Sequence, residues 1–330
     1  MLTPRTPDVS IVIVNWNSRE FLRQCLKTVF QQPHQSKIEV IVIDNASYDG
    51  SEPLVQSQYP QAIFIQGDDN VGFARANNAA AAVATGRNLL FLNPDTEVSA
   101  GAIDRMVRFI DNSPDAGAVG CRLLNTDGSL QTSCVQAYPT VLNQMLDAEA
   151  LRKLWPASPL WGTAAFLADP MQPQRVEGIS GACLLVRRDA FDQVGRFTEA
   201  YFMYAEDMDL CLKLERSGRC NYYLGDVTVV HHGGQSSGAA PESQFGNVMM
   251  RESIARYFEL RHGRGRALLY RSGLAVSALC RVTALGLAQV LSLGRFRTLT
   301  VQGGLRKWSK VLRWSVGAEG WARTHGTRSS

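Results

Sequence analysis

Four continuous apolar runs alternate with stretches of helical periodicity over the first hundred residues. A short unbroken run of Val, Ile, Leu and Phe is typical of a strand that is covered on both faces. The runs occupy residues 9–14, 39–43, 62–65 and 89–92. Apolar spacing predicts a helix over 18–30 capped by Ser18, and an alanine-rich stretch predicts another over 73–85 closed by Gly86. This alternation indicates a parallel, doubly wound α/β sheet.

Polar side chains follow three of the predicted strands. They are Asn15 and Asn17 after the first run, Asp44 and Asn45 after the second, and Asn93 and Asp95 after the fourth. Right-handed crossovers bring the carboxyl ends of parallel strands to one edge, where α/β proteins bind their ligands. The same residue types also make ordinary turns, so it is their convergence that indicates a ligand site.

Asp95 lies where a nucleotide would bind, yet the chain has no glycine-rich phosphate loop. Neither G-x-G-x-x-G after the first run nor G-x-x-x-x-G-K-[ST] occurs. A carboxylate at a strand end can meet phosphate charge indirectly, by holding a divalent cation that bridges phosphate oxygens. We therefore expect a cation at Asp95.

The composition is that of an ordinary globular protein, with 330 residues of which 45% are hydrophobic and 19% charged. Seven scattered cysteines without a C-x-x-C pair favour neither a disulfide framework nor a thiolate zinc site. The N-terminal stretch MLTPRTPDVS lacks the apolar core of a signal peptide. These features predict a cytoplasmic protein.

The charge is divided unevenly along the chain. From Arg251 onward there are 15 Lys and Arg residues against three acids, a surplus of 12 positive charges, whereas the preceding residues carry 19 basic and 27 acidic side chains. A basic, apolar tail suits an anionic membrane surface. No nucleic-acid-reading motif accompanies the charge, so no nucleic-acid partner is expected.

Residues 267–293 are strongly apolar, but Arg271 and Arg281 interrupt them. No uncharged run reaches the roughly 18 residues that a spanning helix needs. We expect this segment to lie in the interface, peripherally on the inner face of the cell membrane. Packing on the main domain, or a homodimer contact, is the alternative.

Six segments in order resemble the inverting family 2 glycosyltransferases of the GT-A fold, within their rhamnosyltransferase-like branch. They are VSIVIVNWNS, IEVIVIDNASYDGS, NVGFARANN, LLFLNPDTEV, GACLLVRRDAFDQVGRFTEAYFMYAEDMDLCLKL and VTVVHHGGQSS. The resemblance covers roughly residues 9–240 and implies a nucleotide-sugar donor, a divalent cation and a single displacement at the anomeric carbon.

The resemblance also implies a domain plan. A GT-A catalytic domain, Rossmann-like with a mostly parallel sheet, would occupy 1–250, with a nucleotide-sugar half at 1–124 and an acceptor half at 125–250. A helical, basic and apolar region at 251–330 would follow.

On the donor side, Asp44 matches the acid that reads the base or ribose of the nucleotide. Asp95 matches the last acid of the family's D-x-D metal motif, whose first position here is the amide Asn93, so metal affinity is expected to be modest. Arg75 is either a phosphate ligand or a solvated helix residue. The residues predicted to bind the donor are Val14, Asn15, Asn17, Asp44, Asn45, Asn70, Arg75, Asn77 and Asn93.

On the acceptor side, three acids open a predicted helix in the sequence YAEDMDL. A carboxylate near the acceptor hydroxyl can take its proton, and the resemblance implies that Asp207 is this base, with Glu206 as the alternate. Acids also stabilise a helix N-terminus, and Asp209 is assigned to a structural or acceptor-binding role. Gly181 and Ala182 are expected to line the acceptor side.

His231 and His232 follow a β-branched strand predicted over 226–230. Neighbouring strand residues point to opposite faces, so the two imidazoles cannot easily share one role. The spacing H-x-x-G-x-S from His231 resembles the family's metal-contacting histidine, which favours His231 over His232. One imidazole with oxygen ligands suits Mg²⁺ or Mn²⁺.

The function implied by the resemblance is transfer of rhamnose from dTDP-rhamnose to a glycan or polyprenyl-linked glycan in cell-surface polysaccharide synthesis, with a UDP-sugar as the alternative donor. A nucleotidyltransferase would share the sheet, but it needs a basic glycine-rich loop where this chain has NWNSREF. An inactive binding protein would have no need of Asp95, Asp207 and His231 together.

Overall fold

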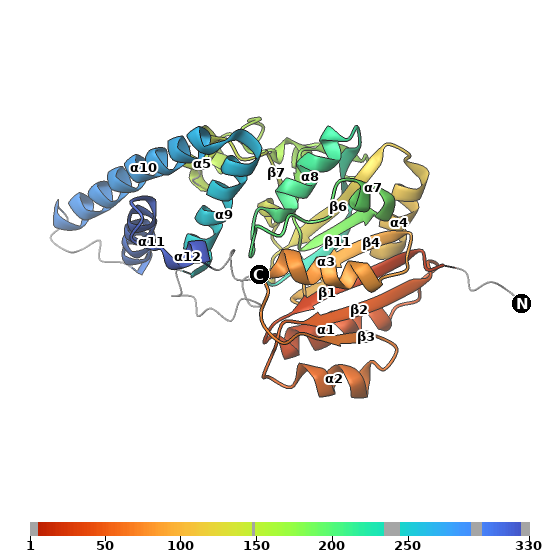
Figure 1. Cartoon of the computed structure of the whole chain (residues 1–330). Helices are drawn as coiled ribbons and strands as arrows, with labels where there is room; N and C mark the ends of the chain where they lie inside the picture. Colours follow the sequence, from red (N-terminus) through yellow and green to blue (C-terminus); the bar gives the residue numbers. More distant parts are fainter. Residues whose placement is uncertain (1–5, 147–148, 234–244, 292–298, 325–330) are drawn as a thin grey trace, which may run out of the picture. The chain divides into compact units, whose positions relative to one another are not determined.

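The computed structural model describes residues 6–146, 149–233, 245–291 and 299–324 (Figure 1). The chain falls into two compact units. We call them the sheet unit, drawn from 1–138, 154–199 and 206–238, and the helical unit, drawn from 139–153, 200–205 and 239–330. The predicted boundary after residue 250 falls inside a helix, because α9 spans Phe245–His262.

The sheet unit is built on a nine-stranded sheet with the order β3-β2-β1-β4-β10-β6-β11-β5, and β8 pairs with β11. Strands β3, β2, β1 and β4 are parallel, β10 runs antiparallel between β4 and β6, and β11 is parallel to β6. The strands are β1 Val9–Asn15, β2 Ile38–Asp44, β3 Ile63–Gln66, β4 Asn88–Leu92, β5 Thr96–Val98, β6 Ala116–Leu124, β8 Gln174–Val176, β10 Cys183–Arg187 and β11 Cys220–His231, with a small pair of β7 Val135–Gln136 and β9 Gly178–Ile179. The predicted α/β sheet is confirmed, and its second half is mixed.

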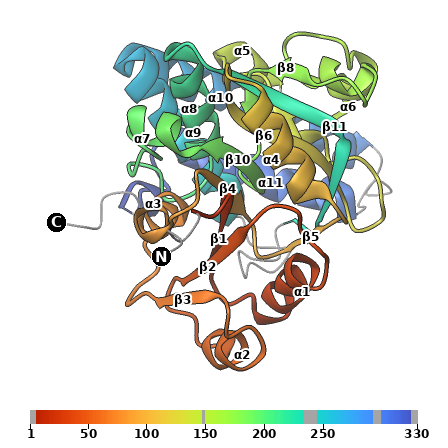
Figure 2. The same cartoon turned by 90° about the vertical axis from the view of Figure 1, so that its right-hand side faces the viewer.

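Helices cover both faces of this sheet, which explains why its inner strands read as unbroken apolar runs (Figure 2). Along β1, Ile11 and Ile13 join the core under one set of helices, while Val12 and Val14 join the core under the other. The first set is α1 Arg19–Phe30, α2 Ser51–Gln58 and α4 Ala102–Asn112, and the second is α3 Phe73–Val83, α7 Arg188–Gln193 and α8 Glu206–Arg216.

Ser18 and Gly86 do not have the roles at helix ends that were predicted for them. Ser18 stands at the N-cap of α1, but its hydroxyl donates to the Trp16 carbonyl at 3.0 Å and not to the helix. Helix α3 ends at Val83, and Gly86 does not close it. A Cβ at Gly86 would lie 2.5 Å from the Ser10 nitrogen, so glycine is required by the close approach of two backbones. Helix α2, which contains Pro53, was not predicted.

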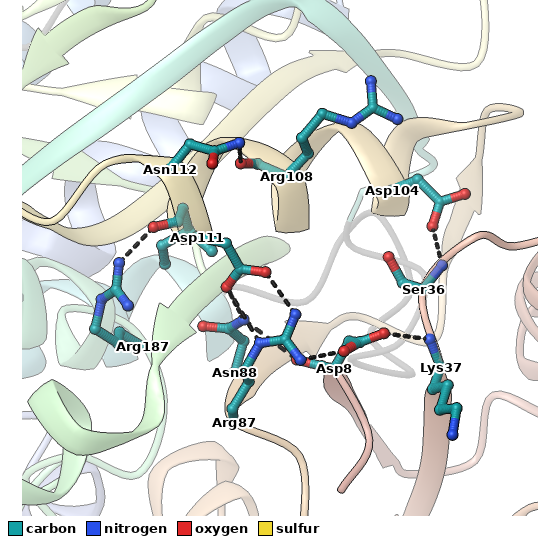
Figure 3. Close-up of polar contacts among 11 residues, drawn as sticks. Asp8, Ser36, Lys37, Arg87, Asn88, Asp104, Arg108, Asp111, Asn112 and Arg187 are labelled. Carbon is teal, nitrogen blue, oxygen red and sulfur yellow. Dashed lines mark hydrogen bonds and ion pairs between the residues drawn. The ribbon is translucent and has the colours of Figure 1, made fainter. Parts of the chain in front are cut away.

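At the amino-terminal edge of the parallel strands, a polar network joins the segments that enter β1, β2 and β4 (Figure 3). Arg87 forms an ion pair with Asp8 and donates from Nη2 to Asp111 at 2.6 Å, while Asn88 donates to the same carboxylate at 3.0 Å. Asp8 in turn accepts from the Lys37 backbone N–H at 2.7 Å. Ion pairs and hydrogen bonds therefore hold the strands together at this edge. The polar side chains predicted to bind ligands lie at the opposite edge.

In the helical unit, α10 Arg264–Leu291 is the longest element and packs against α5 Val141–Leu146, α9 and α11 Leu299–Ser315. An aromatic cluster of Tyr257, Phe258, Tyr270 and Trp314 fills the space between α9, α10 and α11. The remaining helices are α6 Glu149–Leu154 and α12 Trp321–Thr324. By length and composition alone, α10 could cross a membrane.

The two arginines that interrupt the apolar sequence of α10 both turn toward neighbouring helices. Arg271 stacks over the Trp314 ring at 4.2 Å, and Arg281 stacks over the Trp308 ring at 4.1 Å. Arg281 also donates to the Met145 carbonyl at 3.2 Å. As a result, no exposed side chain between Leu268 and Leu291 carries a charge.

Candidate active site

The ends of β1 and β2 meet in a hydrogen-bonded network around Asp44, as the strand pattern predicts. Asp44 is buried, and it accepts from Asn15 Nδ2 at 2.7 Å and from the Ser47 backbone N–H at 2.6 Å. Gln66 at the end of β3 donates to the same carboxylate at 3.2 Å. Asn15 also donates to Ser51 at 2.9 Å. These contacts hold the Asp44 carboxylate in one orientation at the sheet edge.

Ser47, Ser51 and Gln66 were missed as site residues, although the two serines lie in the segment DNASYDGS. Serine hydroxyls beside an Asp were the available signal, since they can hydrogen-bond locally to its carboxylate. Gln66 had none, because only the pairing of β3 with β2 brings it beside Asp44.

The predicted donor ligands in and before α3 mostly contact other residues of the protein. Asn45 donates to Asn70 at 3.3 Å, and Asn70 accepts from the Gly72 N–H at 3.1 Å, so both amides shape the turn before α3. Asn77 is buried and donates to the Phe73 carbonyl at 2.9 Å within its own helix. Arg75 lies 3.9 Å from Glu199 at partial exposure. Among these residues, Asn77 has the surroundings of a structural residue.

Asp95 is a buried carboxylate next to a histidine. Its side chain is 1% exposed, and neither of its oxygens has a hydrogen-bond partner among the described residues. His231 Nε2 lies 3.3 Å from Asp95 Oδ1 and 3.3 Å from Asn93 Nδ2. A buried, unsatisfied carboxylate is costly unless something compensates its charge, and carboxylate oxygen with imidazole nitrogen suits a divalent cation.

Asp95 and His231 are therefore the atoms that fit a metal. Within the described ranges, no group of three or more His, Cys, Asp and Glu side chains is arranged so that it could hold a metal ion. A cation here would have two protein ligands, which leaves the remaining positions to phosphate oxygens and water.

The structure separates the two histidines clearly. His232 Nε2 lies 2.9 Å from Glu97 Oε1 and its Nδ1 lies 3.0 Å from the Thr126 hydroxyl, so both of its nitrogens have polar partners. His231 keeps Nε2 on the side of Asp95. This geometry favours His231 as the ligand. Residues 234–236 of the H-x-x-G-x-S motif that suggested His231 lie outside the described residues.

The tautomer of His231 is set by Gln131, which was not predicted to belong to the site. Gln131 Nε2 donates to Asn125 Oδ1 at 3.0 Å and to the His231 carbonyl at 3.4 Å, so its amide oxygen faces the imidazole. That oxygen lies 2.7 Å from His231 Nδ1. Nδ1 therefore carries the proton, and Nε2 keeps a lone pair, which Asn93 Nδ2 approaches at 3.3 Å and which a metal would take in its place.

Asp207 lies at the N-terminus of α8, beside the start of β10. Its Oδ2 accepts from the Gly181 N–H at 2.9 Å, and its Oδ1 accepts from the Met208 N–H at 2.7 Å. Ala182 continues the link, because its carbonyl accepts from the Asn93 N–H at 3.0 Å. The backbone of Gly181 and Ala182 thus connects Asp207, the candidate base, to Asn93 at the end of β4.

Burial raises the pKa of the Asp207 carboxyl, and the N–H groups of Gly181 and Met208 only partly offset it. Burial and the neighbouring charge of Asp207 raise the pKa of Glu206 much further. Asp209 is fully buried and accepts from the Thr198 hydroxyl at 2.6 Å, which favours the structural alternative over acceptor binding.

Backbone strain is concentrated after β1 and β2 and immediately before Glu206. Five described residues other than glycine have a positive φ, and four of them flank the candidate site. Asn17 and Ala46, at 48° and 59°, follow β1 and β2, while Tyr204 and Ala205, at 69° and 65°, precede Glu206. Such conformations cost free energy and are found preferentially at functional sites.

Comparison with known proteins identifies the class first. The fold is similar to that of the mannosyltransferase PcManGT from Pyrobaculum calidifontis in complex with GDP-Man and Mn²⁺, with a TM-score of 0.56, 19% identity, and coverage of 96% of this chain and 88% of that one. The Glycosyl transferase family 2 model matches residues 10–195. The chain belongs to this family and has its GT-A fold, as the sequence motifs predict.

Two curated relatives are rhamnosyltransferases. The N-acetylglucosaminyl-diphospho-decaprenol L-rhamnosyltransferase of Mycobacterium tuberculosis (strain ATCC 25618 / H37Rv) is 34% identical over 219 residues, which cover 62% of this chain and 70% of that protein. Rhamnosyltransferase WbbL of Escherichia coli (strain K12) is 26% identical over 234 residues, which cover 68% and 83%. The protein is thus a glycosyltransferase with rhamnosyltransferases among its relatives.

Replacing Gln131 with Leu removes the amide that orients His231 and should weaken Mn²⁺ binding by about 10-fold or more, the usual effect of losing a partner behind a metal ligand. Electron paramagnetic resonance of free Mn²⁺, with dTDP present, measures this without turnover. Thr126→Val is the matched control, because it removes the equivalent contact from His232. Unchanged Mn²⁺ affinity in Gln131→Leu would show that His231 is not the ligand or needs no orientation.

Proposed function

We propose that this glycosyltransferase transfers rhamnose from dTDP-rhamnose to a lipid-linked glycan, with inversion and with the help of a divalent cation. The rhamnosyltransferase relatives support the sugar, and the M. tuberculosis relative, named for a diphospho-decaprenol substrate, supports the acceptor class. The observation that carries the mechanism is the pairing of a buried carboxylate, Asp95, with a half-buried one, Asp207. Asp95 lies beside His231, and Asp207 is linked to the same strand through Gly181.

The donor would lie across the ends of β1, β2 and β4. Asp44 would read the base or ribose, since Asn15 and Ser47 already fix its carboxylate. Asp95 and His231 would hold the cation, which when bound neutralises charge on the diphosphate leaving group. Mn²⁺ in the structurally similar mannosyltransferase is consistent with this assignment.

The acceptor hydroxyl would approach from the side of Gly181. Asp207 accepts its proton as the acceptor oxygen bonds to the anomeric carbon, while the bond from that carbon to the diphosphate oxygen breaks on the opposite face. The configuration is therefore inverted. One carboxylate suffices, whereas glycoside hydrolases need two. Two backbone N–H groups hold Asp207, so its orientation is set before the acceptor arrives.

The pKa directions separate the two neighbouring acids. A raised pKa makes the Asp207 carboxylate a stronger base than an exposed aspartate. The pKa of Glu206 is raised much more, by burial and by the charge of Asp207, so Glu206 keeps its proton up to a higher pH than Asp207 does and is less available as a base. This difference supports Asp207 over Glu206 as the base.

The helical unit supports a peripheral position on an anionic membrane. Leu269, Val276, Leu279 and Leu287 of α10 are all more than half exposed, and the exposed side of α10 carries no charge between Leu268 and Leu291. The opposite side is occupied by α5, α9 and α11. One bare apolar side suits a helix that lies in the interface, where a lipid-linked acceptor would be met.

Asp207→Asn should lower kcat for transfer from dTDP-rhamnose by about 10²-fold or more while leaving donor affinity nearly unchanged, because it removes the base and keeps the shape. In the unmodified enzyme, kcat should fall with decreasing pH as the carboxylate of raised pKa becomes protonated. Rates with a polyprenyl-linked acceptor, and donor affinity by calorimetry, measure both effects.

Glu206→Gln is the matched control for Asp207→Asn and should keep most of the activity. Greater damage from Glu206→Gln would reverse the two assignments. Turnover of UDP-sugars without turnover of dTDP-rhamnose would refute the proposed donor and leave the base intact.

Replacing Leu279 and Leu287 with Glu should abolish flotation of the protein with phosphatidylglycerol vesicles, because charge would enter the apolar side of α10. Val83→Glu is the control, since Val83 is an exposed apolar residue of α3 in the sheet unit. Wild-type flotation should weaken with added salt. Equal flotation of all three proteins would favour a packing role for α10.

A further inference from the structure

A basic cavity of about 330 Å³ lies between α9 and α10 in the helical unit. Its lining includes Arg256, Arg264, Arg271 and Arg323, together with Glu252 and Glu259. The lining therefore contains four arginines and two glutamates, a formal surplus of two positive charges. Neither the transfer reaction nor the family motifs, which end before α9, account for this cavity.

Both glutamates already have partners in the cavity wall. Glu252 accepts from Trp314 Nε1 at 2.8 Å and lies 3.3 Å from Arg271. Glu259 lies 3.4 Å from Arg264 and 3.8 Å from Arg256. The two carboxylates thus position Arg256, Arg264 and Arg271 in the cavity wall.

The charged groups of the lining act on one another. Burial lowers the pKa of the Arg271 guanidinium, the attraction of Glu252 opposes this shift, and repulsion from Arg323 adds to it. Like charges gathered at a partly buried place are unfavourable unless an anion offsets them. Arginine forks match the oxygens of a phosphate group in particular.

An exposed apolar residue in the lining favours the phosphate of a lipid over a dissolved phosphate. Leu268 belongs to the lining and is 65% exposed. It begins the uncharged, exposed side of α10 that continues through Val276 and Leu279 toward Leu291. A dissolved phosphate gains nothing from such a surface, whereas the chains of a lipid would lie on it.

We propose that this cavity binds the phosphate of an anionic membrane lipid while the lipid chains follow the bare side of α10. The inference rests on the membrane position proposed above. It adds a specific headgroup site to what would otherwise be diffuse attraction between a basic region and an anionic surface.

The test compares two double variants with equal loss of charge in the same unit. Arg256→Gln with Arg264→Gln removes two cavity arginines and spares Arg271, which stacks on Trp314. Arg266→Gln with Arg313→Gln is the control, because both residues are exposed and neither lines the cavity. Full-length proteins are floated with phosphatidylglycerol and with phosphatidylcholine vesicles, and inorganic phosphate binding is measured by calorimetry.

The cavity variant should lose about 10-fold more affinity for phosphatidylglycerol vesicles than the control, beyond the roughly 1 kcal/mol that each basic residue adds at an anionic surface. Equal losses in the two variants would overturn the headgroup site and leave only diffuse attraction. Phosphate binding by a wild-type protein that does not float would also overturn the lipid assignment.

Transfer to a water-soluble acceptor should be the same in both variants and in the wild type. This arm distinguishes failure of the headgroup site from failure of the proposed function. Loss of dTDP-rhamnose transfer in the wild type would count against the function alone, whatever the vesicles show.

Discussion

The parallel pairing of β1 with β2 and β4 is the constraint on which the candidate site depends. The register places Asn15 opposite Asp44, and β4 ends beside them at Leu92. Because helices bury both faces of these strands, a one-residue slip would misplace every side chain in the two cores. The same register that fills the cores therefore delivers Asn15, Asp44 and Asn93 to a single edge.

Three carboxylates at this edge, of which Asp44 and Asp95 are buried and Asp207 is half-buried, differ in how their charge is met. Asp44 is surrounded by donors from Asn15, Ser47 and Gln66. Asp207 has two backbone donors, which do not fully offset its burial. Asp95 has no hydrogen-bond donor among the described residues. This gradient matches three tasks, since a reader of the nucleoside must be fixed, a base must accept a proton, and a metal ligand must keep its oxygens free.

The candidate site lowers the free energy of unfolding, and interactions elsewhere in the sheet unit compensate for this loss. An unpaired buried carboxylate costs several kcal/mol, and the left-handed conformations of Asn17 and Ala46 add to that cost. Two apolar cores and the network around Arg87 at the far edge lie away from the site and offset it. A cation at Asp95 would recover part of this cost when the donor binds.

Sequence patterns were sufficient for β1, β2, β3 and β4, the two faces that helices cover and the acids at the strand ends, because apolar periodicity and turn chemistry are local. They did not predict β5, β6, β8 and β10. They could not find Gln131, which meets His231 across 100 residues through the pairing of β6 with β11. They gave the wrong reason for Gly86, whose role is set by β1. They showed Arg271 and Arg281 only as interruptions of an apolar run, because the tryptophans over which these arginines stack lie on another helix.

The most direct test of the central claim is the melting temperature of the wild type and of Asp95→Asn, with and without Mn²⁺ and dTDP. If Asp95 is kept unpaired for a cation, the variant should be at least as stable as the wild type without metal, because it buries no charge. Only the wild type should then be stabilised by the ligands, since binding to the native state raises its stability. An equal Mn²⁺-dependent rise in both proteins would contradict the account.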